Sequence, residues 1–135
     1  MRIVFVNSAW PPSWGGGEKW TVEAAEWFRE REDEICVVGR PQSKLVAAVR
    51  GRNLPVQEQR FGGDFDPLAI MRARKLLRDF APDLIVVNFN KEAWHFGLAA
   101  KMLKIPVIAR HGFPLLRNSL HHRRLVENVL TRLVV

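Results

Sequence analysis

Apolar residues recur along the chain as short continuous runs, separated by segments whose apolar positions have helical spacing. The runs cover residues 2–6, 34–39, 56–61, 83–89 and 106–110, and the third is the weakest. Nearly unbroken stretches of Val, Ile and Leu are typical of strands buried on both faces of a parallel sheet. We therefore predict five strands, one for each run.

Amphipathic segments fill the intervals between the runs. The spacing predicts helices over 18–31, 42–51, 66–80, 91–104 and 120–135, with a sixth strand as the alternative for the last residues. Regular alternation of strand and helix predicts an α/β, Rossmann-like, three-layer fold with a parallel sheet of five to six strands flanked by helices. Ligands of such sheets bind beyond the carboxyl ends of the strands, so we expect the ligand-binding residues in the loops that follow the strands.

The helical spacing also predicts which side chains are buried. In the helix over 18–31, the apolar stripe contains Trp20 and Trp27, which we expect in the core. The helix over 66–80 has Asp66 as its predicted N-cap and Pro67 at the first helical position.

Composition narrows the class of protein. The chain has 135 residues, of which 47% are hydrophobic, and this is enough for one domain with a core of its own. The one cysteine, Cys36, lies in an apolar run and is expected in the core, which fits a reducing compartment. No run reaches the roughly 18 apolar residues of a membrane span, and no signal-peptide pattern opens the chain. The expected location is the cytoplasm.

The formal net charge of +7 favours anionic partners such as nucleotides, nucleic acids, phospholipids or charged glycans. The basic cluster at 121–124 is either a solvated helix end or a contact for an anionic acceptor or for the inner face of a membrane. The chain closes on the apolar letters "RLVV". We therefore expect residues 1–135 to form a single domain that is a fragment of a larger protein, with self-association through its exposed apolar surface.

The loop after the first run reads "NSAWPPSWGGGEKW". Gly15, Gly16 and Gly17 let a ligand approach closely and permit backbone conformations closed to other residues. The helix start that follows offers unpaired N–H groups to a phosphate. A simple glycine-rich turn stays an alternative, because neither G-x-G-x-x-G nor the Walker lysine motif is present. Trp10 and Trp14 are candidate stacking surfaces for a sugar ring or for the apolar part of an acceptor.

Two later loops carry further candidate residues. Asn88, Asn90, Lys91 and Glu92 lie at the end of the fourth run and suit hydrogen bonding to a hydroxyl-rich ligand, although Asn90 as a helix cap is an alternative. His111 follows the fifth run, where a histidine can donate a hydrogen bond to a hydroxyl or phosphate, or accept a proton. Gly112 beside it permits close approach, and a loop-capping histidine is the alternative.

The order of these motifs resembles the N-terminal domain of the GT-B retaining glycosyltransferases of family four, in the glycogen-synthase-like group. Gly15, Gly16 and Glu18 fit the G-G-x-E motif that follows the first strand of that family. The stretch "APDLIVVN" resembles its Pro-Asp strand, and "KIPVIARHG" resembles its fifth strand, which ends in histidine and glycine. The turn "REDEI" departs from the usual "RGHEV", and Asn88 stands where a histidine is common.

The resemblance implies an enzyme with two Rossmann-like domains that face a cleft. The N-terminal domain mostly holds the acceptor, while the C-terminal domain, absent from this chain, holds a nucleotide-sugar donor. Residues 15–17 would lie against the donor diphosphate, and His111 would be the catalytic residue that contacts and positions the transferred sugar. The residues implied to bind acceptor or sugar are Trp14, Glu18, Asn88, Asn90, Lys91, Arg110 and Gly112.

The implied chemistry uses the nucleotide-sugar as donor substrate, with no metal and no cofactor. Enzymes of this group show no clear protein nucleophile, and the departing diphosphate helps to deprotonate the acceptor on the same face. Catalysis is then mainly positioning and stabilisation of charge on the leaving group. The acceptor would be a glycan or a lipid-linked molecule, as in polysaccharide biosynthesis. Without the second domain, this chain is expected to be inactive.

Two other classes compete with this interpretation. A stand-alone Rossmann-like module that binds a nucleotide or nucleic acid would use the positive charge, but the motifs of base contact are missing. A signalling receiver domain would need acidic residues at the end of the first strand, where this sequence has Asn7.

Overall fold

Strands and helices alternate in the computed structural model, which describes residues 1–63, 65–88 and 91–110. The strands are β1 (Arg2–Asn7), β2 (Glu34–Gly39), β3 (Val56–Glu58), β4 (Leu84–Asn88) and β5 (Val107–Arg110). The helices are α1 (Gly16–Glu30), α2 (Lys44–Gly51), α3 (Pro67–Phe80) and α4 (Lys91–Met102). The predicted helix or sixth strand near the end of the chain lies outside the described residues.

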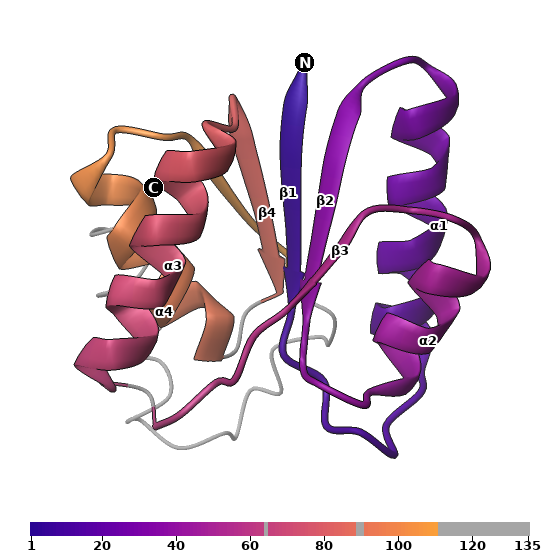
Figure 1. Ribbon diagram of the computed structural model, residues 1–135, viewed down its shortest axis with the longest axis horizontal. Helices are drawn as coiled ribbons and strands as arrows, with labels where there is room; N and C mark the ends of the chain where they lie inside the picture. Colours follow the sequence, from indigo (N-terminus) through magenta and orange to yellow (C-terminus); the bar gives the residue numbers. More distant parts are fainter. Residues whose placement is uncertain (64, 89–90, 111–135) are drawn as a thin grey trace, which may run out of the picture.

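The five strands form one sheet in the order β3-β2-β1-β4-β5, and every neighbouring pair is parallel. Helices α1 and α2 cover one face of this sheet, and α3 and α4 cover the other (Figure 1). The predicted three-layer, Rossmann-like α/β fold is therefore confirmed.

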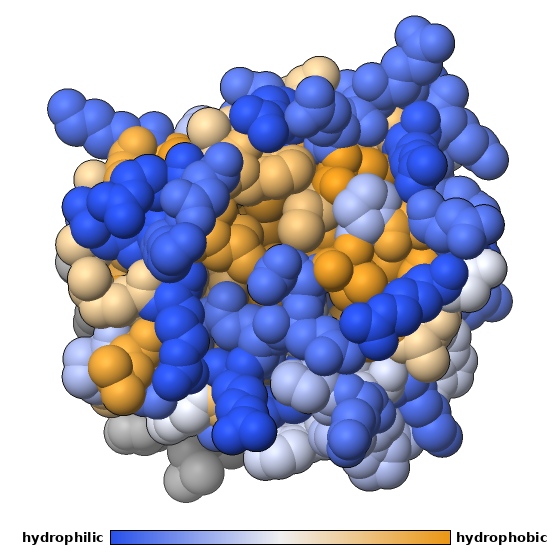
Figure 2. Space-filling model, viewed as in Figure 1, coloured by the Kyte–Doolittle hydropathy of each residue, from blue (hydrophilic) through white to orange (hydrophobic). Residues whose placement is uncertain are grey.

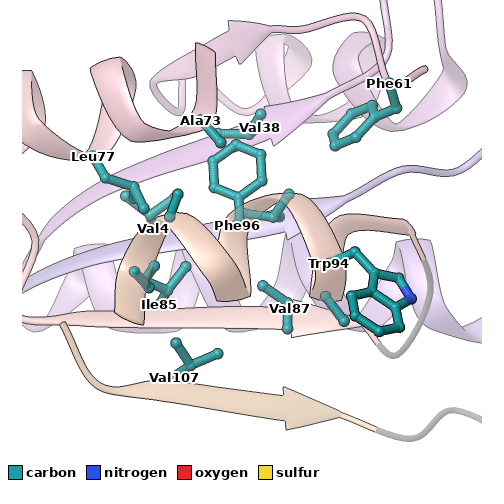
Figure 3. Close-up of a cluster of buried hydrophobic side chains, with 14 residues drawn as sticks. Val4, Val38, Phe61, Ala73, Leu77, Ile85, Val87, Trp94, Phe96 and Val107 are labelled. Atoms are coloured by element: carbon teal, nitrogen blue, oxygen red, sulfur yellow. The ribbon is translucent and has the colours of Figure 1, made fainter. Parts of the chain in front are cut away.

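The sheet separates two apolar cores because successive side chains of a strand point to opposite faces. On β1, Ile3 and Phe5 are buried on the side of α1 and α2, while Val4 and Val6 are buried on the side of α3 and α4. Figure 3 shows the second core, in which strand side chains meet Leu77 of α3 and Phe96 of α4. Both faces of the central strands are thus apolar, as the unbroken Val and Ile runs predicted.

The strand register aligns the carboxyl ends of the strands. Asn7 at the end of β1 is paired with Gly39 of β2, and Asn88 at the end of β4 is paired with Arg110 of β5. Strands β2 and β3 follow one another on one side of β1. The chain then crosses over, and β4 and β5 lie on the other side of β1. The reversal lies between β1 and β4, and the position beyond their carboxyl ends, the β1–β4 crevice, is where sheets of this kind bind ligands.

Two expectations about tryptophan burial are wrong. Trp20 and Trp27 are 36% and 51% exposed, so they do not belong to the core. The buried face of α1 is instead formed by Thr21, Val22 and Ala25. These smaller side chains let the helix pack closely on the sheet, where an indole has no room.

Other local expectations are confirmed, with one adjustment. The Asp66 side chain accepts a hydrogen bond from the Leu68 backbone N–H at 3.0 Å, and Pro67 opens α3 as its first residue. Cys36 is half-buried rather than fully buried, and desolvation raises the pKa of its thiol to about 11. Within residues 1–63, 65–88 and 91–110, no helix has the length and apolar character needed to cross a bilayer.

Helix α3 offers a matched pair of leucines to test the core. Leu77 is fully buried, whereas Leu68 on the same helix is 64% exposed. Leu77→Ala is expected to lower the free energy of unfolding by about 2–5 kcal/mol, because it removes buried methyl groups and leaves a cavity. Leu68→Ala should change it by less than about 0.5 kcal/mol. Urea unfolding of both variants measures the difference, and equal losses would contradict the described orientation of α3.

Candidate functional site

Buried polar side chains gather at the carboxyl edge of the sheet. They lie in the loops that follow the strands or in the first two turns of the helices that come next, and they are Asn7, Ser8, Thr21, Arg40, Ser43, Gln59, Glu92 and His95. Buried polar groups are stabilised only when they are hydrogen-bonded. The partners of these groups therefore define how this edge is built.

The end of β1 is tied to the start of α1 by side-chain hydrogen bonds. The Asn7 side-chain amide donates to the Thr21 hydroxyl at 3.2 Å and to the Glu18 carboxylate at 3.4 Å. The Thr21 hydroxyl donates to the Gly17 carbonyl at 2.8 Å, and the Gly15 backbone N–H donates to Glu18 at 2.7 Å. Glu18 thus holds the glycine loop from within, in addition to any contact with a ligand.

The three consecutive glycines do not adopt an unusual backbone conformation. Gly15 is the N-cap of α1 with extended backbone angles, and Gly16 and Gly17 form the first turn. No described glycine has a positive φ angle. The backbone freedom that glycine permits is therefore not used at these positions. A Cβ at Gly16 would meet no atom of the described residues within 4 Å apart from its own helical turn, so among these residues the start of α1 is open to an approaching molecule.

Arg110 lies against this helix start. Its guanidinium is 4.5 Å from the centroid of the Trp20 ring, and a Cβ on Gly17 would lie 3.8 Å from one of its nitrogens. The end of β5 thus brings a cation to the first turn of α1, where the unpaired N–H groups also favour negative charge. Arg110 and residues 15–17 form one positively polarised edge.

A buried acid and a buried base lie beneath the β1 loop. Glu92, in the first turn of α4, is 1% exposed and accepts hydrogen bonds from the backbone N–H and the hydroxyl of Ser8. Burial raises the pKa of the Glu92 carboxyl to about 7, although Ser8 and Arg40 oppose the shift. Arg40, directly after β2, is 8% exposed, and its pKa is lowered by desolvation. A carboxyl with such a pKa exchanges its proton near neutrality.

Arg40 and Lys91 place their cations around Trp10. The Arg40 guanidinium is 4.0 Å from the Trp10 ring centroid, and the Lys91 ammonium is 5.9 Å from it. Lys91 also donates to the Gly62 carbonyl at 3.3 Å. Trp10 and Trp14 are 61% and 47% exposed, so both indoles face solvent.

The other predicted site residues divide into two groups. Asn88 is half-buried at the end of β4, next to Arg110. Asn90, His111 and Gly112 lie outside the described residues. The structure thus brings residues 15–17, Glu18 and Arg110 together at one part of the edge, with Lys91 beside Trp10 at another.

Sequence reasoning did not select Ser8 or Arg40 as site residues. A usable signal was present for Arg40, since it is a charged residue directly after a buried strand. Glu92 was predicted to lie at the carboxyl edge as a polar group for a hydroxyl-rich ligand, and the structure places it there but buried against Ser8. Only the packing of α4 shows that this carboxyl faces inward.

A hollow also lies between β3 and α3, and it shares Gln59 with this edge. Figure 2 shows it near the centre of the view, with an apolar floor and a hydrophilic rim. Cys36, Leu76 and Phe80 line it together with polar residues of β3 and α3. None of the predicted site residues borders this groove. Among the described residues, no three His, Cys, Asp or Glu side chains are grouped so as to hold a metal ion.

Glu92 is expected to make folding stability depend on pH. Its pKa is raised from 4.5 to about 7 by folding, so between these values the folded chain binds a proton that the unfolded chain has lost. The contribution of Glu92 to the free energy of unfolding therefore falls as the pH rises through this window, and then levels off. Glu92→Gln cannot ionise and lacks this slope.

We expect the free energy of unfolding of the wild type, relative to Glu92→Gln, to decrease by about 1 kcal/mol or more from about pH 5 to about pH 8. Urea unfolding at several pH values measures it. Glu30→Gln is the control, because it removes a carboxylate from the exposed end of α1. If the free energy of unfolding relative to Glu30→Gln has the same pH dependence as that relative to Glu92→Gln, the buried position of Glu92 is not the cause of the slope.

Comparisons with known proteins agree on the fold. The chain is similar to a glycosyltransferase from Rickettsia africae, with a TM-score of 0.73 at 19% identity over 97% of this chain and 34% of that one. It is similar to Anabaena Alr3699/HepE in complex with UDP-glucose, with a TM-score of 0.75 at 19% identity over 98% and 34%. It also matches Acinetobacter baumannii MurG, with a TM-score of 0.67 at 16% identity over 98% and 39%. At such identities the similarity establishes the fold.

The chain spans 34–39% of the length of these three proteins, which fits the N-terminal domain of a GT-B glycosyltransferase. No curated protein sequence matches the chain. The family model of Glycosyltransferase Family 4 matches residues 14–133, which is most of the chain. The chain therefore belongs to Glycosyltransferase Family 4.

Proposed function

We propose that this chain is the acceptor-side half of an enzyme that transfers a sugar from a nucleotide-sugar to a glycan or lipid-linked acceptor. Family membership supports the class of reaction. The observation that carries the proposal is the open start of α1 at the β1–β4 crevice, where a Cβ on Gly16 would meet no neighbour. The stand-alone nucleotide- or nucleic-acid-binding module has no comparable support.

The donor diphosphate is proposed to lie against residues 15–17. The backbone N–H groups of Gly16 and Gly17 and the positive end of the α1 dipole favour a phosphate there, while the Gly15 N–H donates to Glu18. Arg110, beside Gly17, adds a full positive charge next to the same turn. These groups would stabilise the charge that develops on the departing diphosphate. The Anabaena relative was solved with UDP-glucose, which makes that nucleotide-sugar the first donor to test.

The remaining roles need the second domain. That domain would hold the nucleotide-sugar across the cleft, and His111, outside the described residues, would position the transferred sugar as the catalytic residue. Retention of the anomeric configuration would follow from attack on the face that the leaving diphosphate occupies. Asn88, Asn90, Lys91 and Gly112 would then hydrogen-bond or admit the sugar and the acceptor.

Gly16→Ala tests the donor loop without disturbing the fold. Gly16 and Gly51 are both exposed helical glycines without positive φ, and a Cβ at either would meet no atom within 4 Å. Both alanine variants should keep the free energy of unfolding or raise it by up to about 1 kcal/mol. Only Gly16→Ala should lower sugar transfer by the full-length enzyme, by about tenfold or more, because its methyl group intrudes on the donor. Equal activity in both variants would exclude close approach of the donor at Gly16.

Residues 1–135 alone are expected to transfer no sugar, because the donor-binding half is missing. Incubation with UDP-glucose and a mixture of glycan acceptors, followed by mass spectrometry of the products, tests this. The full-length protein under the same conditions is the positive control. Transfer by the short chain would overturn the division of roles between two domains.

An anionic membrane surface is a second proposed partner, and the outward face of α3 favours it. Phe65, Leu68 and Met71 are 68%, 64% and 53% exposed at the beginning of this helix. The exposed cations Arg72, Lys75 and Arg78 follow on the same helix. Exposed apolar side chains beside cations are typical of a surface that docks on acidic lipid headgroups. Such docking would bring the site to a lipid-linked acceptor.

The double variant Leu68→Gln/Met71→Gln is expected to weaken binding to vesicles of phosphatidylglycerol and phosphatidylcholine by about tenfold. Met102→Gln, at a position 58% exposed at the end of α4, is the control and should bind normally. Sedimentation with anionic and with purely zwitterionic vesicles measures the partition. Equal loss in both variants, or equal binding to both lipids, would contradict this docking face.

A further inference from the structure

The Trp10 side chain is exposed to solvent but contacts a buried residue. Its side chain is 61% exposed, whereas the Arg40 guanidinium 4.0 Å from its ring centroid belongs to a residue that is only 8% exposed. The buried Arg40 guanidinium therefore supports an indole that stays mostly exposed to solvent. A cation held over an aromatic ring stabilises the pair by about 0.5–2 kcal/mol. Trp14, on the same loop, has no aromatic or cation contact of this kind among the described residues.

Arg40 is fixed in place by backbone acceptors from two other loops. Its Nε donates to the Ser8 carbonyl at 2.6 Å, and its Nη1 donates to the Phe61 carbonyl at 3.2 Å. The guanidinium also lies 5.4 Å from the Phe61 ring centroid. A lysine cannot make this planar contact and the divergent hydrogen bonds together. The position of the Trp10 support is thus set by the loops after β1, β2 and β3.

Glu92 completes the support from the opposite side. Its carboxyl accepts from the Ser8 N–H at 3.3 Å and from the Ser8 hydroxyl, and so holds the residue whose carbonyl binds Arg40. Burying an acid and a guanidinium generally stabilises a fold less than apolar packing of the same volume does. A network of this kind that ends at an exposed indole is better explained by a ligand than by stability.

We propose that the outward face of Trp10 is a stacking surface for a pyranose ring of the acceptor, with Arg40 and Glu92 as positioning residues that hold the indole at the crevice. The inference rests on the proposed sugar-transfer function and adds a binding surface to it. The apolar C–H face of a pyranose covers the indole, and the Lys91 ammonium, 5.9 Å from the Trp10 ring centroid, lies within reach of the ring hydroxyls. Stacking of this kind fixes the acceptor while leaving its hydroxyl groups free to react.

Fluorine NMR of the chain labelled with 5-fluorotryptophan tests the proposal, since the chain has five tryptophans and Trp10→Phe assigns one resonance. Methyl β-glucopyranoside is the probe, and glycerol at the same concentration is the control for nonspecific polyol effects. We expect the sugar to shift the Trp10 resonance and to leave Trp14 and Trp27 unchanged. A sugar shift confined to another tryptophan, or none at all, would overturn the stacking surface.

Variants separate positioning from general stability. Arg40→Lys and Glu92→Ala are expected to move the Trp10 resonance in the free chain and to reduce its sugar-induced shift by about threefold or more. Glu92→Gln keeps an acceptor for Ser8 and should restore most of that shift. The Trp14, Trp20 and Trp27 resonances report on folding and should stay in place. An unchanged Trp10 resonance and sugar shift in Arg40→Lys and Glu92→Ala would overturn the positioning role.

Failure of the stacking surface can be told apart from failure of the proposed sugar transfer. If the sugar shifts Trp10 but the full-length enzyme transfers no sugar, the stacking surface stands and the proposed reaction fails. If transfer occurs while Trp10→Phe leaves the KM for the acceptor unchanged, the reaction stands and the stacking surface fails.

Discussion

In a parallel sheet covered by helices on both faces, the central strands meet water only at their two ends, and much of this structure follows from that constraint. Successive residues of β1 enter two separate apolar cores, so no ligand-binding side chain can lie along the strand. Polar residues are confined to the ends, and every helix begins at the carboxyl end because the connections are parallel crossovers. Eight buried polar residues accordingly gather at one edge, from Asn7 at the end of β1 to His95 in α4.

The reversal of strand order at β1 gives this edge its shape. Because β2 and β4 lie on either side of β1, the loops that follow β1 and β4 diverge to opposite faces of the sheet. The start of α1 is left open on one side, with Arg110 beside it. On the other side, Glu92 of α4 reaches back beneath the β1 loop. The same reversal thus produces both the polarised helix start that is proposed to hold a phosphate and the supported indole that is proposed to bind a sugar.

The sequence predicts most of the architecture, because burial on both faces leaves a strong pattern. Strands, helices and the Asp66 cap are recovered, since each depends on residues close together in the chain. Tryptophan burial is not recovered, because a helical stripe fixes which residues share a face but not which part of that face reaches the sheet. Trp20 therefore lies at the rim of the core and becomes a partner of Arg110.

The candidate site is only partly predictable for a related reason. The glycine loop and Arg110 are visible as residues that follow strands. The Ser8–Arg40–Glu92 network joins residues that are up to 84 positions apart in sequence, so only the packing reveals it. The reason given for the glycines also changes, because open space at Gly16 replaces unusual backbone angles.

The central claim is that the carboxyl edge between β1 and β4, rather than the groove between β3 and α3, receives the nucleotide-sugar. Titration of the isotope-labelled chain with UDP-glucose, followed by backbone amide chemical shifts, tests this most directly. We expect weak binding that shifts the amides of residues 15–17 and of Arg110. Shifts confined to Cys36, Leu76 and the other residues that line the β3–α3 groove away from the edge would contradict the claim.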